Sequence, residues 1–312
     1  MAQVKEEGRA PGRQPAVGWP QATPGAPQQA MRFTPQEGYA GLSGHTLVIA
    51  GCGGLAHLGE LAVDALVSSF QLKRVAIVET SNLLPVVMAS AWVPPGGGKE
   101  GELELTTTAE VYQAANVPRL SVLQLRAPPA DGRRGALAEE LWAWACQEGA
   151  AEVVVVSACS SHVKVDADFA ASTELRSLQV RGTGEKPAAP GLGQDFLPLG
   201  HSLSEEELEG ADCDIFALQR LLRGSGLARS LLLKAAEQRE QPASEARSGP
   251  DALCLLGMTG EILDGRVLEQ LSLAVCGCIA SRLADTQTPN LRPPPSWHYQ
   301  MQSAPSPQWL WG

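Results

Sequence analysis

Runs of apolar residues alternate along the chain with stripes at helical spacing, and this order predicts an α/β fold. Continuous apolar runs predict buried strands at residues 47–50, 74–79 and 152–158. The last of these, EVVVVSA, holds four successive valines, which suit a strand covered on both faces. From Leu58 to Phe70, apolar residues recur at i, i+3, i+4 and i+7, as in a helix packed on a sheet. We therefore predict an α/β domain with a mostly parallel sheet covered by helices.

Weaker patterns complete this outline. Apolar and polar residues alternate at 103–105 and 120–125, which predicts half-buried or edge strands. A last strand is predicted in the run ALCLLG. Further helices are predicted at four places, from about Gly135 with Leu137, Leu141, Trp144 and Ala145 on one face, at 205–223, at 227–237 and around Leu268–Ile279. Residues 182–200 and 237–250 are rich in Gly, Pro and charge, and we interpret them as loops.

The two ends of the chain differ from its middle. Residues 1–30 are rich in Pro, Gly, Ala and Gln without periodicity, so we expect them to be disordered. An organellar transit peptide is the alternative, which Glu6 and Glu7 disfavour. The prolines of residues 286–312 predict an extended tail. One α/β domain over residues 31–285 is expected between these ends.

Composition narrows the classes of partner. The formal net charge of the 312 residues is −10, which argues against a nucleic-acid or anionic-membrane surface. No window approaches the roughly 18 apolar residues that a membrane helix needs, and the N-terminus lacks the apolar core of a secretory signal. The seven cysteines contain no CxxC pair, so we predict neither a disulfide framework nor a metal site. An intracellular protein that binds other proteins or small molecules is indicated.

The most conspicuous motif is the glycine turn in TLVIAGCGGLAHLGELAVDAL, residues 46–66. Gly51-x-Gly53-x-x-Ala56 follows a strand and precedes a helix, and Glu79 closes the next strand, where a ribose-binding acid stands in dinucleotide-binding proteins. A tight strand-to-helix turn needs glycine with or without a phosphate, however. The turn leaves open a nucleotide-binding enzyme, either NAD(P)-dependent or nucleoside-phosphorylase-like.

Other candidate residues favour a structural interpretation. His57 beside the turn has the position of a surface or capping residue. Ser160, Ser161 and His162 end a strand, but adjacent residues of one loop rarely align as nucleophile and base, and no GxSxG elbow is present. Gly224–Gly226 can receive an anion or simply separate two helices. We therefore predict no catalytic residues and no cofactor.

The tail contains three of the seven tryptophans, Trp297, Trp309 and Trp311. Exposed tryptophans are an aggregation hazard, so a tail that holds them is expected to bind a partner. The alternative, which applies best to Trp297, is that the tail packs on its own domain.

An ordered series of segments resembles the family of proteasome assembly chaperone 2. The segments are GLSGHTLVIAGCGGLAHLGELAVDALVSSF, ELELTTTAEVYQ, RLSVLQLRAP, AEVVVVSACSSH and PPPSWHY, over roughly residues 31–312. The resemblance implies a three-layer α/β/α sandwich, nucleoside-phosphorylase-like but non-catalytic. It also implies a cytoplasmic and nuclear chaperone of the 20S proteasome core particle. Such a chaperone forms a heterodimer with proteasome assembly chaperone 1, and the pair binds the α-subunit ring.

The resemblance extends to the tail. Tails of this family end in a hydrophobic-Tyr-any pattern that docks between α subunits, where a lysine meets the terminal carboxylate. The matching positions are Leu310, Trp311 and Gly312. Trp311 replaces the tyrosine and lacks its hydroxyl, so one hydrogen bond of the family's docking is missing. The segment MRFTP resembles the family's usual start, which makes Met31 an alternative initiator to Met1.

Overall fold

A central sheet of nine strands organises the part of the chain that the structure describes. The computed structural model describes residues 31–92, 105–164, 171–180, 195–198, 222–240, 249–283, 286–295 and 297. The strands are β1 (Arg32–Pro35), β2 (Thr46–Ala50), β3 (Lys73–Glu79), β4 (Val87–Ala89), β5 (Leu105–Thr107), β6 (Ala109–Gln113), β7 (Leu120–Leu125), β8 (Glu152–Ser160), β9 (Leu175–Val180), β10 (Leu197–Pro198) and β11 (Asp251–Thr259). The helices are α1 (Leu58–Ser69), α2 (Arg134–Gln147), α6 (Leu227–Glu240) and α7 (Gly265–Arg282), with short 3₁₀ turns at Leu55–His57 and Ser161–Val163.

The strand order in the sheet is β1-β3-β6-β7-β2-β8-β11-β9-β10. Strand β2 lies between β7 and β8 and is parallel to both, and β8 is parallel to β11. Antiparallel pairs join β1, β3, β6 and β7 on one side and β11 to β9 on the other. The predicted α/β class is confirmed, with its parallel core at the centre of the sheet.

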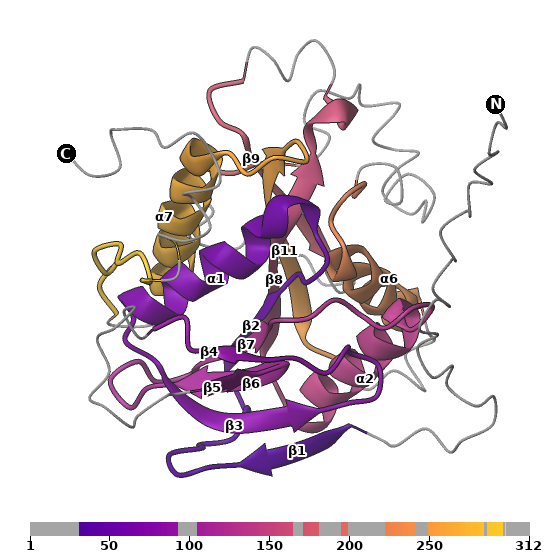
Figure 1. The fold of residues 1–312 in the computed structure, drawn as a ribbon, viewed down its shortest axis with the longest axis vertical. Helices are drawn as coiled ribbons and strands as arrows, with labels where there is room; N and C mark the ends of the chain where they lie inside the picture. Colours follow the sequence, from indigo (N-terminus) through magenta and orange to yellow (C-terminus); the bar gives the residue numbers. More distant parts are fainter. Residues whose placement is uncertain are drawn as a thin grey trace, which may run out of the picture.

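Helices cover the sheet in two separate layers (Figure 1). Helices α1 and α7 pack together on one face, and α2 and α6 pack together on the other. Each pair shares its own buried cluster with the sheet residues that point toward it, because successive side chains of a strand point to opposite faces. The three-layer sandwich is therefore present.

Strand β7 corrects one prediction. Its alternating pattern predicted a half-buried or edge strand, yet all six residues are buried between β6 and β2. Its polar residues have partners inside the protein: Gln113 Nε2 donates to Ser121 Oγ at 2.7 Å, and Gln124 Nε2 donates to Asp64 Oδ1 at 2.6 Å. Polar alternation here marks an internal hydrogen-bond network rather than contact with solvent.

Other boundaries differ from the sequence outline. The pattern at 103–105 overlaps β5, which lies outside the main sheet and pairs with β4 in a separate two-stranded ribbon. Helix α6 continues to Glu240, beyond its predicted end at 237. Strands β1, β4, β6, β9 and β10 were not predicted. The helix predicted at 205–223 lies almost wholly outside the described residues.

Trp297 packs on its own domain. It is 2% exposed and belongs to the buried cluster that α1 and α7 share. Ahead of it, Leu291 packs against the same cluster, and the backbone N–H of Arg292 donates to Ser69 Oγ at 2.9 Å. For Trp297 the alternative of packing in its own domain is therefore correct. Leu310, Trp311, Gly312 and residues 1–30 lie outside the described residues.

Candidate functional site

The backbone donors of the glycine turn point to groups of the protein itself. The turn joins β2 to α1, and Gly53 adopts a positive φ of 68° that favours glycine. The Gly51 N–H donates to Val156 O at 2.8 Å, and the Leu55 N–H donates to Gly224 O at 2.9 Å. The Gly53 N–H donates to Glu60 Oε1 at 3.1 Å, so a carboxylate of the protein takes an anion's place.

A second glycine loop closes over the first. Gly226 lies so near the turn that a Cβ on it would be 2.4 Å from Cys52 O and 2.5 Å from Gly54 N. The Leu227 N–H donates to Cys52 O at 3.0 Å, where α6 begins. Backbone from residues 224–226 thus packs directly on the turn that a phosphate would have to approach. The loop serves to join α6 to α1 and β8.

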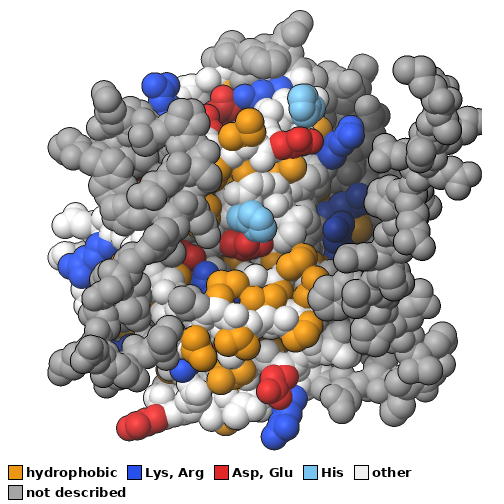
Figure 2. Space-filling model, viewed as in Figure 1, with side chains coloured by type: hydrophobic (Ala, Val, Ile, Leu, Met, Phe, Trp, Pro, Cys, Tyr) orange, Lys and Arg blue, Asp and Glu red, His pale blue; other side chains and the backbone are white. Residues whose placement is uncertain are grey.

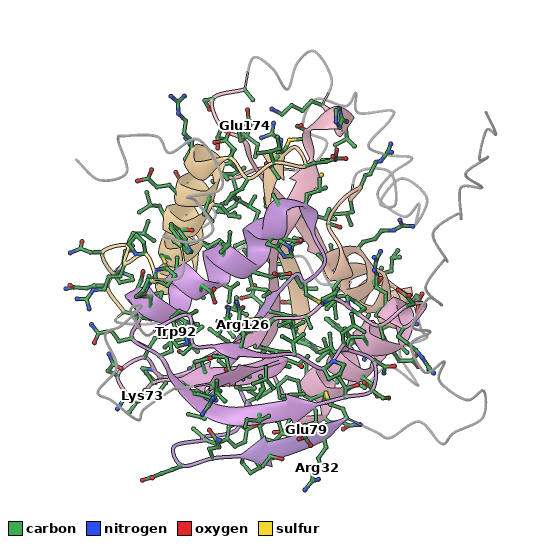
Figure 3. All side chains as sticks on the ribbon, in the orientation of Figure 1. Arg32, Lys73, Glu79, Trp92, Arg126 and Glu174 are labelled. Atoms are coloured by element: carbon green, nitrogen blue, oxygen red, sulfur yellow. The ribbon has the colours of Figure 1, made fainter. Side chains whose placement is uncertain are left out.

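The sheet order also separates Glu79 from the turn. In the dinucleotide fold the strand that carries the ribose-binding acid lies beside the first strand. Here β6 and β7 lie between β3 and β2. Glu79 is at the margin of the molecule with Arg32, the nearest pair of their charged atoms being 4.0 Å apart (Figure 3). The ribose-binding role that the alternative of a nucleotide-binding enzyme gives to Glu79 therefore does not fit this fold.

His57 is a surface residue of the turn, as predicted. Its side chain is 69% exposed, and its Nδ1 lies 2.8 Å from Glu60 Oε2. This hydrogen bond and the charge of Glu60 raise the pKa of His57 above its usual value, against the opposing effect of burial. Ala56 and His57 both adopt positive φ, of 54° and 53°, so the entry to α1 carries backbone strain.

The serines at the end of β8 cap a turn. Ser160 is buried, and its Oγ accepts from the His162 N–H at 3.3 Å, which closes the 3₁₀ turn. Among the described residues, no hydrogen bond joins a hydroxyl of Ser160 or Ser161 to the His162 ring. Lys164, at the end of this turn, pairs with Glu174. The segment has the geometry of a capped strand end rather than of a nucleophile and its base.

The described ranges contain neither a metal-binding cluster nor a membrane-spanning helix. No group of three or more His, Cys, Asp or Glu residues there is arranged to hold a metal ion. No helix in the same ranges is long and apolar enough to cross a membrane. Most described cysteines are small core residues as predicted, the buried ones being Cys52, Cys159, Cys254, Cys276 and Cys278.

The ribbon of β4 and β5 carries a feature that the sequence analysis missed. Six large hydrophobic side chains are exposed in the described part of the chain, and four of them lie on or beside the ribbon. These four, which we call the ribbon patch, are Leu84, Val87, Met88 and Leu105, with exposed fractions of 45%, 66%, 37% and 48%. Figure 2 shows hydrophobic side chains gathered on this face, where Figure 1 places β4 and β5.

A groove runs beside the ribbon patch. It has a volume of about 570 Å³ and lies between the end of β3 and the ribbon. Arg32 and Glu79 line one side, and Val87 and Thr107 line the other. The groove and the patch form one continuous surface, because Val87 belongs to both.

Buried charges fix the ribbon to the sheet. Glu110 of β6 is fully buried, and its Oε1 lies 2.9 Å from Arg74 Nη1. The same oxygen accepts from the Thr107 N–H of β5 at 2.9 Å, and Arg74 Nη1 donates to Leu105 O at 2.8 Å. Tyr112 donates its hydroxyl hydrogen to Glu110 Oε2 at 2.5 Å, and burial raises the pKa of Tyr112 above its usual range.

A second ion pair lies under α1, next to this network. Arg126, the residue directly after β7, contacts both carboxylate oxygens of Asp64, at 2.9 and 2.7 Å. The ring of Trp92, which follows β4, lies over the Arg126 guanidinium with 5.5 Å from Cζ to the ring centroid (Figure 3). Trp92 Nε1 donates to the Tyr112 hydroxyl at 3.4 Å. The segment after β4 is thereby joined to both ion pairs.

Sequence comparisons with known proteins agree on one family. Residues 48–244 match the PAC2 family. Proteasome assembly chaperone 2 of Homo sapiens is 28% identical over 242 residues, covering 74% of this chain and 85% of that protein. Its counterpart in Nematostella vectensis is 34% identical over 132 residues, covering 42% of this chain and 52% of that protein. Among solved structures, Pyrococcus furiosus PbaA, an archaeal homolog of proteasome-assembly chaperone, has a TM-score of 0.48 at 14% identity, covering 80% of this chain and 85% of that chain.

Proposed function

The chain belongs to the PAC2 family, and from this membership we propose that it is a non-enzymatic chaperone of proteasome assembly. Family membership over residues 48–244 is the observation that carries this proposal. The site geometry supports it in two ways. The glycine turn uses its N–H groups internally, and the ribbon patch offers apolar surface of the kind that protein partners cover.

In more detail, the proposed form is a heterodimer with proteasome assembly chaperone 1 that binds the α-subunit ring of the 20S core particle. A chaperone of this kind needs one surface for its partner chain and another for its client. The ribbon patch is available for the first. The client contact is proposed to involve the tail, and the place of action is the cytoplasm and nucleus, where core particles assemble.

The tail is proposed to dock through Leu310 and Trp311, with the backbone of Gly312 at the mouth of the pocket. Trp297 is held in the domain core, and residues 298–312 follow this fixed point in the sequence. At about 3.3 Å per residue, they span at most roughly 50 Å when stretched. This is enough to reach a pocket on a neighbouring subunit while the domain lies outside it.

Co-expression tests the proposal directly. The full chain and proteasome assembly chaperone 1 are co-expressed, and the purified product is sized by light scattering and then bound to particles that contain the α ring. We expect a 1:1 complex that binds these particles. A chain that ignores both the chaperone and the α ring would contradict the proposed function.

The tail is tested by two single substitutions in the same complex. Trp311→Ala removes the ring that the proposed docking would bury and should weaken binding to the α ring at least tenfold, since burial of a large apolar side chain contributes about 1.5–3 kcal/mol. Trp309→Ala is the matched control, because it removes the same side chain two residues earlier and should have a smaller effect. Equal binding by both variants would contradict docking through Trp311.

A further inference from the structure

We infer that the ribbon patch is the docking surface for a second folded protein, which covers the face of the ribbon that carries Val87 and Leu105. This inference rests on the proposed function, in which the chain is one half of a heterodimer. It adds the part of the surface through which the two chains meet.

The patch is concentrated rather than scattered. Val87 pairs with Thr107 and Ala89 pairs with Leu105 across the ribbon, so its exposed apolar side chains come from two adjacent strands. The other two exposed large hydrophobics, Ile262 and Leu273, lie in the loop before α7 and in α7 itself. Single exposed hydrophobics are normal on a protein surface, whereas exposed hydrophobics grouped on two paired strands are typical of an interaction site.

The ribbon is held rigidly although it is small. An isolated two-stranded ribbon is marginally stable in water, so its order must come from contacts with the domain. Arg74 and Glu110 supply these contacts to β5, and Thr108 Oγ1 accepts from the Val86 N–H at 2.8 Å beside β4. Burying a carboxylate such as Glu110 costs free energy unless it is paired. The fold thus fixes a ribbon whose outward side chains stay partly exposed to water, and a prearranged surface loses less entropy on binding.

The shape of the patch indicates a folded partner rather than a short peptide. Val87 lines the groove, but Leu84, Met88 and Leu105 lie outside it. A peptide confined to the groove would leave Leu105 in water, whereas a broader surface can cover Leu105 together with Val87, which lies on the same face of the ribbon. A stable interface buries roughly 800 Å² on each partner. The ribbon patch supplies the apolar centre of such an interface, and the partner must extend over the polar residues around it.

Charge disfavours a second copy of the same chain as the occupant. The chain has a net charge of −10, so two copies repel each other at long range. Exposed charges near the patch have both signs, with Arg32 and Lys73 positive and Glu79 negative, so they do not offset this repulsion locally. We therefore assign the surface to a different folded chain that presents an aliphatic face and is less acidic than this protein.

The experiment measures pairing of the full chain with proteasome assembly chaperone 1 by biolayer interferometry. Val87→Glu and Leu105→Glu place a charge at the centre of the patch, and each should weaken pairing at least tenfold. Leu273→Glu is the matched control, because Leu273 has the same exposed fraction of 48% as Leu105 but lies on α7. The control should pair like wild type. All three variants should keep the wild-type melting temperature, since each replaced side chain already meets solvent.

The outcomes separate this inference from the proposed function. If wild type pairs and both patch variants pair equally well, the ribbon patch is not the docking surface, while the heterodimer stands. If wild type does not pair at all, the proposed heterodimer fails and the inference fails with it. If wild type forms a homodimer that Val87→Glu disperses, the occupant is a second copy and our choice of partner is wrong.

Discussion

In the glycine turn, the N–H groups of Gly51, Gly53 and Leu55 all donate to the protein itself, whereas in the ribbon patch four large apolar side chains face water. The turn lies at the N-terminal end of α1 and has the sequence pattern of a binding site. The ribbon has no recognisable pattern. Its second strand begins directly after residues 93–104, which lie outside the described residues. Judged from the sequence, the turn is the stronger candidate for a binding site. Judged from the structure, the ribbon patch is the stronger candidate.

The difference shows that a sequence motif can arise from the needs of local backbone geometry alone, without a functional site. Glycines at 51 and 53 satisfy a tight turn and a close approach to β8, where a Cβ on Gly51 would lie 2.6 Å from the Ser157 side chain. Those needs are met whether or not a ligand is present. The exposed apolar side chains of the ribbon patch have no such structural explanation, because their exposure does not stabilise the fold.

The largest expected effect is a loss of stability when the packing of residues 224–226 on the glycine turn is disrupted. Gly226→Val adds a Cβ 2.4 Å from Cys52 O at a residue with a φ of 56°, so both overlap and backbone strain result. We expect the free energy of unfolding, measured with urea, to fall by about 3 kcal/mol or more.

Gly277→Ala in α7 is the control for Gly226→Val, because no atom lies within 4 Å of the added Cβ. An alanine in a helix interior should raise the free energy of unfolding by about 0.5–1 kcal/mol. A Gly226→Val protein as stable as wild type would show that the two glycine loops are not packed together.

The sequence predicts the core of the fold better than its margins. Strands β2, β3, β8 and β11 and helix α1 are strongly apolar or periodic, and all were predicted within a few residues. Neighbours in the sheet could not be predicted, because register and order depend on contacts distant in sequence. Strand β7 illustrates this, since Gln124 is polar in the sequence and becomes buried only because Asp64 of α1 lies opposite it.

The second largest effect is expected when the contacts that hold the ribbon are weakened and the residues of the ribbon patch are left unchanged. Glu110→Gln removes the charge that faces Arg74 and weakens the acceptor for the Thr107 N–H. We expect a loss of about 1–3 kcal/mol in the free energy of unfolding, as for a charged hydrogen-bond partner. Amide hydrogen exchange at Leu105–Thr107 should also accelerate more than in β8.

Glu79→Gln is the control for Glu110→Gln. Glu79 is 63% exposed and 4.0 Å from Arg32, so its loss should change the free energy of unfolding by less than about 0.5 kcal/mol. Equal exchange rates in wild type and Glu110→Gln would mean that Arg74 and Glu110 do not hold the ribbon.

The candidate site was largely beyond sequence reasoning. Leu84, Val87 and Met88 read as ordinary apolar residues, and only the structure shows that no described element covers them. The pairing of Arg74 with Glu110 joins β3 to β6 across 36 positions of the chain, which periodicity cannot reveal. In contrast, the sequence alone already disfavoured a nucleotide-binding enzyme, because no catalytic residues accompany the glycine turn.

A smaller effect on stability is expected at the strained entry to α1, where His57 lies. The carboxylate of Glu60 raises the pKa of His57 above its usual value of 6.5, so protonated His57 stabilises the fold. This contribution is complete below about pH 6.5 and is lost as the pH rises through the higher pKa of the folded protein. His57→Asn removes the titration but tolerates the positive φ. Wild type should exceed the variant by less than about 1 kcal/mol at pH 5.5, and the difference should shrink at pH 8.5.

The opposite pH dependence would contradict this assignment of charge. Comparison of each pair at the same pH removes the contribution of the other histidines. A difference that grows from pH 5.5 to 8.5 would mean that neutral His57 is the form favoured in the folded protein.

The last prediction is that no nucleotide or phosphate binds at the glycine turn, whose N–H groups are already bonded within the protein. We expect NAD, NADP, ATP, nucleosides and inorganic phosphate to show no binding tighter than about 1 mM by calorimetry, which corresponds to about 4 kcal/mol. Glu60→Ala sharpens this test, because it frees the Gly53 N–H but leaves the Leu55 N–H bonded to Gly224 O. We expect this variant to remain without measurable affinity as well.

Binding by Glu60→Ala alone would show that the Glu60 carboxylate is what excludes anions, and that the loop at 224–226 leaves room for them. Micromolar binding by wild type would have the larger consequence. If that binding disappeared in Gly53→Val while the melting temperature held, the turn would be a nucleotide site. The proposed function as a non-enzymatic chaperone would then have to give way to an enzyme. The sheet order argues against this result, because β6 and β7 separate Glu79 from the turn, whereas in the dinucleotide fold the strand with the ribose-binding acid lies beside the first strand.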